Sequence, residues 1–376
     1  MSVPGPASCA SFVESLAASA QGGAHCLTSA PLGWGKTEAL LKIRSALAAR
    51  GVATIFMDLF TAASTPERLL ATLAQSVRPH LRAESGEVDR LVDEGVNDRQ
   101  RAPAALLRLM ERVTLGDLTT AFAWLIDEAT EIRSLAYFPG LSEIEKPFAA
   151  MLRASPGSIL TSSYMGLAAA LFPDFDPVAF PGLRADDLEP GGRRGHVTPG
   201  LSAALALTGG SASTLLPLLA DMEGTGDPAR SLARLLYPGA PLEITCRRHY
   251  DILLMRSRGY AVCKRAAEVV ASAPGKRLTD LVPLIARTPG ASRQYLRWLV
   301  EVGLLTQTNK RYDFADPILG LWASLYLGRA GHPSPEQIAS AVRARIANAE
   351  ATELASPTGD EAPRLIRRPD RFEEID

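Results

Sequence analysis

The 376-residue sequence has no long apolar run and only four cysteines, and each shortage excludes a class of protein. No stretch of 18 apolar residues without charge occurs, so we expect no membrane-spanning helix. The N-terminus lacks a basic segment followed by an apolar one, so we expect no signal peptide. Cys9, Cys26, Cys246 and Cys263 form neither a CxxC pair nor a Cys/His metal pattern. We therefore expect reduced thiols and a cytoplasmic location.

An excess of charge of one sign is missing as well, because 40 lysines and arginines are balanced by 41 acidic residues. With 47% hydrophobic and 22% charged residues, the composition is that of a globular protein that can bury a large core. The length favours two or three domains, and we find no internal repeat.

The sequence does contain a candidate phosphate-binding loop at residues 30–37, APLGWGKT, although Ala30 stands where the first glycine is usual. In such a loop, backbone N–H groups surround the β- and γ-phosphates, Lys36 supplies positive charge and Thr37 offers a hydroxyl to Mg²⁺. The candidate nucleotide-binding residues are Ala30, Pro31, Leu32, Gly33, Trp34, Gly35, Lys36, Thr37 and Glu38.

The surroundings of this loop agree with the motif. Residues 26–28 before it are typical of a short strand, and residues 38–44 after it are typical of a helix. Strand, loop and helix is the order that the motif requires, and the helix dipole also favours a bound anion. A chance match in a glycine-containing turn is the alternative, and this context makes it the weaker one.

A second motif follows about 90 residues later, where the apolar run 122–126 ends in Asp127 and Glu128. A parallel strand buried on both faces is apolar throughout, and open α/β sheets bind ligands at the carboxyl ends of their strands. Asp127 is therefore the candidate Mg²⁺ ligand together with Thr37, and Glu128 is the candidate to position or deprotonate the attacking water. A solvated acidic turn would explain one carboxylate, but two adjacent ones after a phosphate loop favour nucleotide binding.

Strands and helices alternate over residues 1–185, which predicts a parallel sheet covered by helices on both faces. Further strands are expected at 52–59, 158–163 and 178–180, and helices at 66–77, 104–113 and 141–152. Thr65 fits the N-cap of the first of these helices, because Pro66 follows it. The predicted fold class is α/β, with a P-loop NTPase core in residues 1–185.

One of these strands ends in hydroxyl side chains, Thr161 and Ser162 among them. At the tip of a strand beside the acidic one, such a hydroxyl would bind the attacking water or the γ-phosphate and sense the nucleotide state. The alternative is a strand-to-helix turn, in which a serine caps a helix that begins near Met165. Both alternatives stay open, and Thr161 and Ser162 join Lys36 and Glu128 as candidate catalytic residues.

Beyond residue 185 the strand pattern ends. Pro and Gly cluster at 189–195 and helical patterns then continue to about residue 237, so we assign residues 186–243 to a helical lid. Residues 244–328 show helix, short helix, turn, helix and β-hairpin, which is the order of a winged helix-turn-helix. Residues 329–376 are expected to form a helix at about 335–354 and a tail rich in proline and charge.

The last helix of the predicted winged helix-turn-helix is expected at 293–301, with Ser292 as its N-cap. Its inward face at helical spacing consists of Leu296, Leu299 and Val300. The hairpin that follows has a polar tip at residues 309–311. The candidate DNA-binding residues, which point outward or lie at this tip, are Arg293, Gln294, Arg297, Lys310 and Arg311.

The charge distribution favours a nucleic-acid surface in the same segment. Residues 244–312 contain 13 lysines and arginines and 4 acidic residues, a local net charge of +9, whereas the rest of the chain carries −10. Such asymmetry is typical of proteins that contact phosphate groups. The alternative is a winged helix that docks a protein, with some of these arginines paired to the acidic core.

With these features combined, the chain resembles the archaeal-type P-loop ATPases, a group of AAA+/STAND-like NTPases, from about residue 26 to residue 327. The markers are the phosphate loop, the pair Asp127-Glu128, the strand at 159–163, the turn Thr208-Gly209-Gly210 and the segment 312–322. Departures from the usual pattern are Ala30 and Ser162 in place of glycine and Ala212 in place of proline. The resemblance implies an ATP-dependent switch with a C-terminal winged helix.

We therefore expect an enzyme that binds Mg-ATP, hydrolyses it slowly to ADP and phosphate, and couples the nucleotide state to a winged helix on duplex DNA. The first alternative is a signalling or scaffold NTPase whose winged helix docks a protein partner. The second is a transcription regulator that binds ATP and barely hydrolyses it. The expected cofactors are ATP and Mg²⁺, no membrane partner is expected, and a nucleotide-dependent oligomer stays open.

Overall fold

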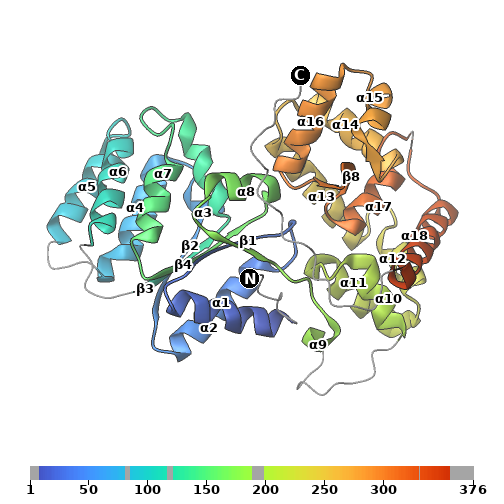
Figure 1. Cartoon of the computed structure of the whole chain (residues 1–376), viewed down its shortest axis with the longest axis horizontal. Coiled ribbons are helices and arrows are strands. Elements are labelled where there is room, and N and C mark those ends of the chain that lie inside the picture. The colour runs from blue at the N-terminus through green and yellow to red at the C-terminus, as the bar shows by residue number, and fades with distance from the viewer. Residues whose placement is uncertain (1–7, 81–84, 117–121, 189–198, 330, 356–376) are drawn as a thin grey trace.

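The structure, a computed structural model, describes residues 8–80, 85–116, 122–188, 199–329 and 331–355 (Figure 1). The predicted charged tail therefore lies outside the described residues from position 356 on. Two halves stand side by side in the view of Figure 1. We call residues 8–188 the sheet half and residues 199–355 the helical half.

The sheet half is built on five strands, β1 (His25–Ser29), β2 (Ala53–Asp58), β3 (Phe122–Asp127), β4 (Gly157–Ser162) and β5 (Asp176–Ala179). Their spatial order is β2-β3-β4-β1-β5, and every neighbouring pair is parallel. Strand β4 thus lies between β1, which leads into the phosphate loop, and β3, which ends in Asp127. The carboxyl ends of all three strands meet at one edge of the sheet, where α/β proteins bind ligands.

Helices cover both faces of this sheet, as the alternating pattern predicts (Figure 1). On one face, α1 (Cys9–Gln21) and α2 (Lys36–Ala49) pack against Leu125 and Ile159. On the other face, α4 (Pro66–Val77), α6 (Ala102–Thr114) and α7 (Glu145–Arg153) pack against Trp124, Ile126 and Leu160. Successive side chains of a strand point to opposite faces, so the central residues of β3 and β4, Trp124 to Ile126 and Ile159 to Leu160, are apolar on both faces.

The remaining elements of the sheet half are short or peripheral. They are α3 (Leu59–Ala62), the 3-10 helix η1 (Arg78–His80), α5 (Ser85–Asn97), the 3-10 helix η2 (Ala129–Tyr137), α8 (Met165–Leu171) and α9 (Ala185–Leu188). The predicted N-cap of α4 is confirmed, because the Thr65 hydroxyl accepts a hydrogen bond from the backbone N–H of Arg68 at 3.3 Å.

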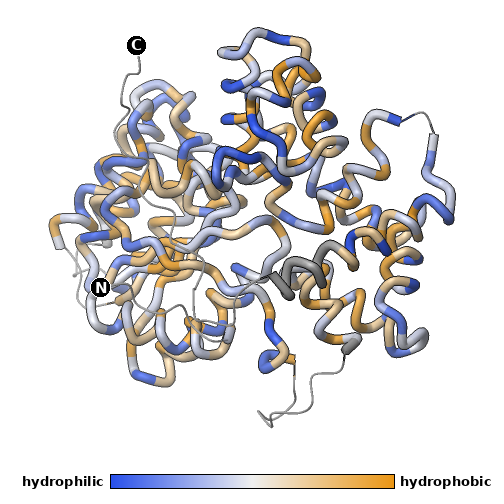
Figure 2. Tube along the Cα trace, turned by 45° about the vertical axis from the view of Figure 1, so that its right-hand side comes forward, coloured by the Kyte–Doolittle hydropathy of each residue, from blue (hydrophilic) through white to orange (hydrophobic). Residues whose placement is uncertain are grey.

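The helical half begins with α10 (Pro199–Thr208), α11 (Ala212–Thr225), α12 (Pro228–Leu235) and α13 (Pro241–Arg256). It continues with α14 (Tyr260–Ser272), α15 (Leu278–Ile285), α16 (Pro289–Glu301), α17 (Pro317–Tyr326) and α18 (Pro335–Ala355). One antiparallel sheet joins β6 (Lys276–Arg277), β8 (Arg311–Phe314) and β7 (Leu305–Thr308) in that spatial order. Hydrophobic residues recur along the helices of both halves (Figure 2). In the helical half, buried apolar residues between Ala204 and Val342 form one cluster.

The elements α14, α15, α16 and the β7–β8 hairpin follow the order predicted for a winged helix-turn-helix. The predicted start of the last helix is wrong by one turn. Helix α16 begins at Pro289 behind the N-cap Thr288, whose hydroxyl accepts from the N–H of Ala291 at 3.3 Å. Ser292 lies buried inside the helix. The residues between Thr288 and the predicted start at 293 thus form the first helical turn, since threonine followed by proline is itself a strong helix start.

The hairpin tip has a defined turn geometry. Thr308 pairs with Arg311, and the two residues between them, Asn309 and Lys310, have φ angles of 53° and 64°. A two-residue loop with both φ angles positive is the type I′ turn, which matches the twist of an antiparallel hairpin. Lys310 is exposed at this tip, as the sequence pattern predicts.

Candidate functional site

The loop between β1 and α2 carries the residues predicted to bind phosphate. Lys36 opens helix α2, and Gly35 before it takes a left-handed φ of 93°. The Lys36 ammonium donates to the carbonyl oxygens of Ala30 at 2.9 Å and Pro31 at 3.1 Å. Its Nζ also lies 3.6 Å from Oε1 of Glu128, and the side chain is only 5% exposed. Burial lowers the pKa of Lys36, while the nearby Glu128 and Asp127 act in the opposite direction.

Three predicted residues from separate segments meet around Asp127. The Thr37 hydroxyl donates to Oδ2 of Asp127 at 2.5 Å, and the Thr161 hydroxyl donates to Oδ1 of the same carboxylate. A hydroxyl and a carboxylate side by side are hard oxygen donors of the kind that Mg²⁺ takes from proteins, with phosphate oxygens and water completing the octahedron. The residues present therefore fit the expected metal, although the described residues contain no cluster of three or more His, Cys, Asp or Glu side chains.

Glu128 follows directly at the end of β3 and has a left-handed φ of 50°. Its Oε2 accepts two hydrogen bonds from Ser163, one from the backbone N–H at 2.9 Å and one from the hydroxyl at 2.6 Å. Ser162 points elsewhere, because its Oγ lies 2.8 Å from Oγ1 of Thr130 and accepts from the N–H of Tyr164 at 3.0 Å. The contact with the Glu128 carboxylate thus comes from Ser163, whereas the candidate Thr161 accepts from the backbone N–H of Glu128 at 3.3 Å.

A side chain from the helical half completes this cluster. Arg256, the last residue of α13, donates through Nη1 to Oγ of Ser163 at 3.1 Å and through Nη2 to Oε1 of Glu131 at 2.7 Å. Its guanidinium carbon lies 4.6 Å from the ring centre of Tyr164, in a cation–π arrangement. Burial raises the pKa of Glu131, and the charge of Arg256 opposes that rise. In the sequence, Arg256 is only one of the 13 basic residues of segment 244–312, and it lies 93 positions from Ser163.

The helical half also covers the phosphate loop itself. The N–H of Ser213 donates to the carbonyl of Gly33 at 2.8 Å. A Cβ on Gly33 would lie 2.2 Å from the Ser213 hydroxyl and 2.9 Å from a ring carbon of His249, so only glycine allows this approach. Trp34 Nε1 donates to Oδ2 of Asp316, the buried N-cap of α17, at 3.4 Å. Nothing in the sequence marked Ser213 or His249 as neighbours of this loop.

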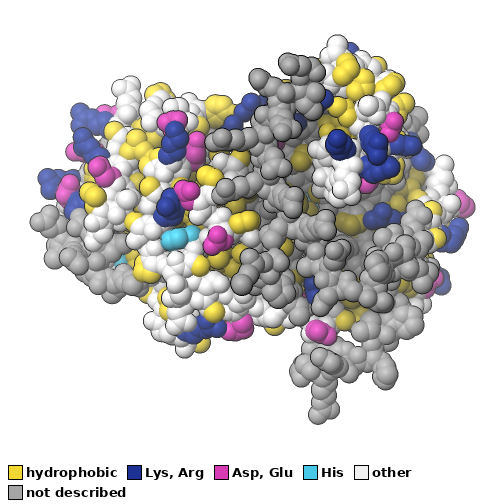
Figure 3. All heavy atoms as spheres, in the orientation of Figure 1, with side chains coloured by type: hydrophobic (Ala, Val, Ile, Leu, Met, Phe, Trp, Pro, Cys, Tyr) yellow, Lys and Arg dark blue, Asp and Glu magenta, His cyan; other side chains and the backbone are white. Residues whose placement is uncertain are grey.

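The five candidate DNA-binding residues lie in α16 and at the hairpin tip. Arg293 and Arg297 are exposed, whereas Gln294 is half-buried. Arg297 Nε donates to Glu301 at 3.0 Å, and Arg311 Nη1 donates to the carbonyl of Gly275 at 2.7 Å. Lys and Arg side chains are visible over the helical half in the space-filling view (Figure 3). The C-terminal end of α16 packs against α8 of the sheet half.

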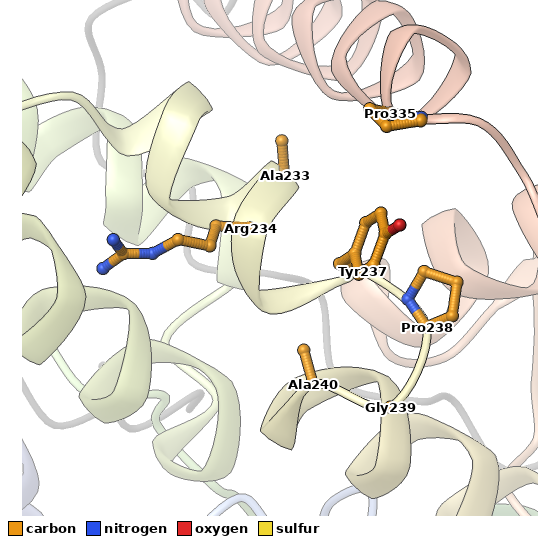
Figure 4. Close-up of a pocket in the computed structure, with 7 residues that line it drawn as sticks. All are labelled: Ala233, Arg234, Tyr237, Pro238, Gly239, Ala240 and Pro335. Atoms are coloured by element: carbon orange, nitrogen blue, oxygen red, sulfur yellow. The ribbon is translucent and has the colours of Figure 1, made fainter.

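A shallow pocket of about 410 Å³ lies apart from these residues, where α12 and the turn after it meet the start of α18 (Figure 4). Its lining is mainly apolar and consists of Ala233, Arg234, Tyr237, Pro238, Gly239, Ala240 and Pro335. None of these residues belongs to the predicted nucleotide site. In the part of the chain that the structure describes, no helix combines the length and the apolar character needed to cross a membrane.

The parallel sheet, the loop before α2 and the acidic end of β3 together define a P-loop NTPase fold of the α/β class. The fold of this chain is similar to that of the Walker-type ATPase PABY2304 of Pyrococcus abyssi, with a TM-score of 0.56 and 16% identity. The match covers 83% of this chain and 94% of the other. The predicted resemblance to archaeal-type P-loop ATPases is therefore confirmed at the level of the fold. No protein-family model and no curated protein matches the sequence.

Two further structures match with lower scores. One is Drosophila ORC bound to GC-rich DNA and Cdc6, with a TM-score of 0.30, 10% identity, and coverage of 83% of this chain and 89% of the other. The second is the RuvB Holliday junction branch migration motor of Thermotoga maritima, with a TM-score of 0.34, 12% identity, and coverage of 81% and 90%. Superpositions this loose carry no argument about the present chain.

Proposed function

We propose that this protein binds Mg-ATP, hydrolyses it slowly to ADP and phosphate, and uses the nucleotide state to move its helical half. The observation that carries the proposal is the convergence of Lys36, Thr37, Asp127 and Glu128 at one edge of the sheet. These residues come from two motifs about 90 positions apart, and together they supply a phosphate-binding cation, two Mg²⁺ ligands and a carboxylate that can position or deprotonate water.

The roles follow from the donor and acceptor inventory of each side chain. The backbone of residues 30–38 and the Lys36 ammonium would bind the phosphates, which replace the Ala30 and Pro31 carbonyls as partners of Lys36. Thr37 and Asp127 would hold Mg²⁺, which neutralises phosphate charge when bound. Thr161 orients Asp127 through its hydroxyl hydrogen bond. Ser162 would contribute indirectly, because the contacts of its Oγ with Thr130 and with the N–H of Tyr164 fix the backbone around Ser163.

Glu128 is the proposed general base. As the water oxygen forms its bond to the γ-phosphorus and the bond to the ADP oxygen breaks, Glu128 takes up the proton that the water loses. The carboxylate lies 3.6 Å from Lys36, so the base and the proposed phosphate-binding cation are adjacent. This proximity supports hydrolysis rather than nucleotide binding alone, which is the main distinction from a regulator that barely hydrolyses ATP.

The proposed DNA contact uses Arg293, Gln294, Arg297, Lys310 and Arg311. The exposed arginines of α16 and the exposed tip at Lys310 support it, as does the local net charge of +9. Arg256 belongs to that basic segment but is turned into the sheet half, so it adds nothing to a DNA surface. A protein partner on the same winged helix is the second candidate function, because Arg297 already has an acidic partner in Glu301.

The domain division is part of the proposal. Residues 1–185 would form the ATPase core, 186–243 the lid, 244–328 the winged helix-turn-helix and 329–376 the C-terminal helix and tail. The four cysteines are free thiols, which supports the proposed cytoplasmic location. A nucleotide-dependent oligomer belongs to the same proposal.

The experiment that tests nucleotide binding is a titration of Mg-ATP into the wild type and Lys36→Ala. Loss of the ammonium removes the charge that compensates the phosphates, so binding to the variant is expected to become undetectable. Lys42→Ala is the control, because Lys42 lies on the same helix with an exposed side chain. If Lys36→Ala binds Mg-ATP as tightly as the wild type, the nucleotide assignment is wrong.

A further inference from the structure

Ser163 is contacted from both halves of the chain at once. Its N–H and hydroxyl donate to Oε2 of Glu128, and its Oγ receives the hydrogen bond from Arg256. Gly303, just after α16, approaches it from another side, since a Cβ there would lie 2.5 Å from the Ser163 carbonyl oxygen. Ser163 therefore joins the proposed base to the two elements of the helical half that reach it, α13 and the end of α16.

The direction of the hydrogen bonds around Ser163 is determined by Arg256. A guanidinium has donors only, so Oγ of Ser163 must act as the acceptor in that contact. The single hydroxyl proton of Ser163 is then left to donate to Oε2 of Glu128 at 2.6 Å. Arg256 thus enforces the hydrogen bond from Ser163 to Glu128, which the hydroxyl could otherwise leave by rotating.

This hydrogen bond occupies the oxygen that a base needs. A carboxylate oxygen has two lone pairs, and Oε2 of Glu128 already accepts two hydrogen bonds from Ser163. The other oxygen, Oε1, faces the Lys36 ammonium at 3.6 Å. A water molecule that must donate its proton to Glu128 therefore meets a carboxylate whose acceptor positions are largely taken.

Arg256 is itself firmly seated. It pairs with Glu131 at 2.7 Å, stacks over the Tyr164 ring and is only 10% exposed. Arg256 ends helix α13, and His249 earlier on the same helix lies against Gly33 of the phosphate loop. A displacement of α13 by ligand at the phosphate loop would therefore withdraw Arg256 from Ser163 as well.

We propose that Arg256 is a positioning residue that restrains Glu128 through Ser163, so that hydrolysis becomes fast only when α13 moves away from the sheet half. The inference rests on the proposed ATP hydrolysis and states how the position of α13 would regulate it. The helical half would thus inhibit proton uptake by Glu128 until it moves.

The test is single-turnover hydrolysis of Mg-ATP by the full chain, with Arg256→Ala beside the wild type and Glu128→Gln. Arg256→Ala is expected to hydrolyse faster by about two- to tenfold, the range that the net contribution of one hydrogen bond allows. Its affinity for Mg-ATP should be equal to or higher than that of the wild type, because the variant lacks the contacts that α13 must break when ligand displaces it. Arg258→Ala is the matched control, because Arg258 lies two positions further on and is exposed.

A second variant separates this role from a purely structural one. Ser163→Ala removes the hydroxyl, keeps the backbone N–H bond to Glu128, and alters the packing less than loss of an arginine. It should accelerate hydrolysis like Arg256→Ala, and the double variant should be no faster than Ser163→Ala alone. This non-additivity is the signature of two residues acting in series.

The outcomes distinguish this inference from the proposed function. If the wild type hydrolyses ATP, Glu128→Gln does not, and Arg256→Ala is unchanged or slower, Arg256 does not restrain the base and the inference is wrong alone. Independent, multiplicative effects of Ser163→Ala and Arg256→Ala would overturn it too. If Arg256→Ala and Ser163→Ala both hydrolyse ATP faster than the wild type while Glu128→Gln stays inactive, the restraint is supported. If no variant hydrolyses ATP, the proposed function fails and the inference with it.

Discussion

The sheet half and the helical half contribute to the candidate site in different ways. From the sheet half come Lys36, Thr37, Asp127 and Glu128, which stand in two short sequence motifs at the ends of adjacent elements. From the helical half come single residues on separate elements, such as Ser213 on α11, through its backbone N–H, Arg256 on α13 and Asp316 before α17. The residues of the sheet half are of the types that phosphate chemistry needs, so a sequence motif identifies them. The residues of the helical half belong to no motif and are identified only by their place in the structure.

This difference yields predictions that separate the chemistry of one half from the docking of the other. The largest expected effect concerns the base. Glu128→Gln keeps the shape and the Ser163 hydrogen bonds but cannot take up a proton, so Mg-ATP should bind normally while turnover falls by about 10²–10⁴-fold. Steady-state phosphate release measures it, with the exposed Glu143→Gln as the control. Turnover at the wild-type rate would mean that another residue activates the water.

The next effect concerns the contact between the halves. Gly303→Ala would place a Cβ 2.5 Å from the Ser163 carbonyl at a φ of 77°, so strain and overlap should together lower the free energy of unfolding by about 2–4 kcal/mol. Gly226→Ala is a matched control, since Gly226 has a φ of 65° and open space around it, and should cost only about 1–2 kcal/mol. Urea denaturation compares the two variants. Equal losses would show that the Gly303 contact contributes nothing.

The third effect concerns the outer surface of the helical half. In the full chain, Arg293→Ala and Arg297→Ala should weaken duplex DNA binding by about 1–3 kcal/mol for each base contact and relax any sequence preference. Lys310→Ala with Arg311→Ala should weaken binding alike for all sequences and flatten the log K against log salt slope by about one unit per lost phosphate contact. Fluorescence anisotropy over a salt series checks both. Absence of DNA binding even at low salt, with a protein bound instead, would favour the docking-module alternative.

The smallest effect is a dependence on pH. Burial, with Lys36 and Arg248 nearby, lowers the pKa of His249 in the folded protein. Below its ordinary pKa of about 6.5 the unfolded chain takes up a proton that folded His249 resists, so stability should fall as the pH drops from about 7.5 to about 5.5. Burial lowers the pKa of His25 as well, so His249→Gln should reduce this loss without removing it. Identical losses in both proteins, measured by urea denaturation, would contradict the assignment.

The amount that the sequence could predict follows the same division. The strands β1 to β4, helix α4 and the two motifs were predictable because apolar periodicity and the phosphate-loop residues are local signals. The start of α16 was misplaced because Thr288 and Ser292 are both credible N-caps, and in the structure the Thr288 hydroxyl accepts from the N–H of Ala291 while Ser292 is buried. Arg256 and His249 could not be found, since their neighbours are brought to them by the folding of distant segments.

Ser163 is an intermediate case. It stood in the run of hydroxyls at the end of β4, but the sequence alone could not say which of three consecutive side chains faces Glu128. Alternation along a strand separates neighbours, yet the strand ends at Ser162 and the next residue leaves the pleat. Where regular structure stops, periodicity no longer assigns a direction to a side chain.

Because Trp34 of the phosphate loop is hydrogen-bonded to Asp316, its intrinsic fluorescence is sensitive to the contact between the loop and the helical half. Indole emission depends on the polarity and charge around the ring, and Trp34 lies within the loop while its partner belongs to the helical half. Of the other three tryptophans, Trp124 is enclosed by the sheet core and Trp322 by the helical core, while Trp298 on α16 is half-buried against the helical core. A change in fluorescence on adding nucleotide would thus report, without any attached dye, a change in the surroundings of the phosphate loop.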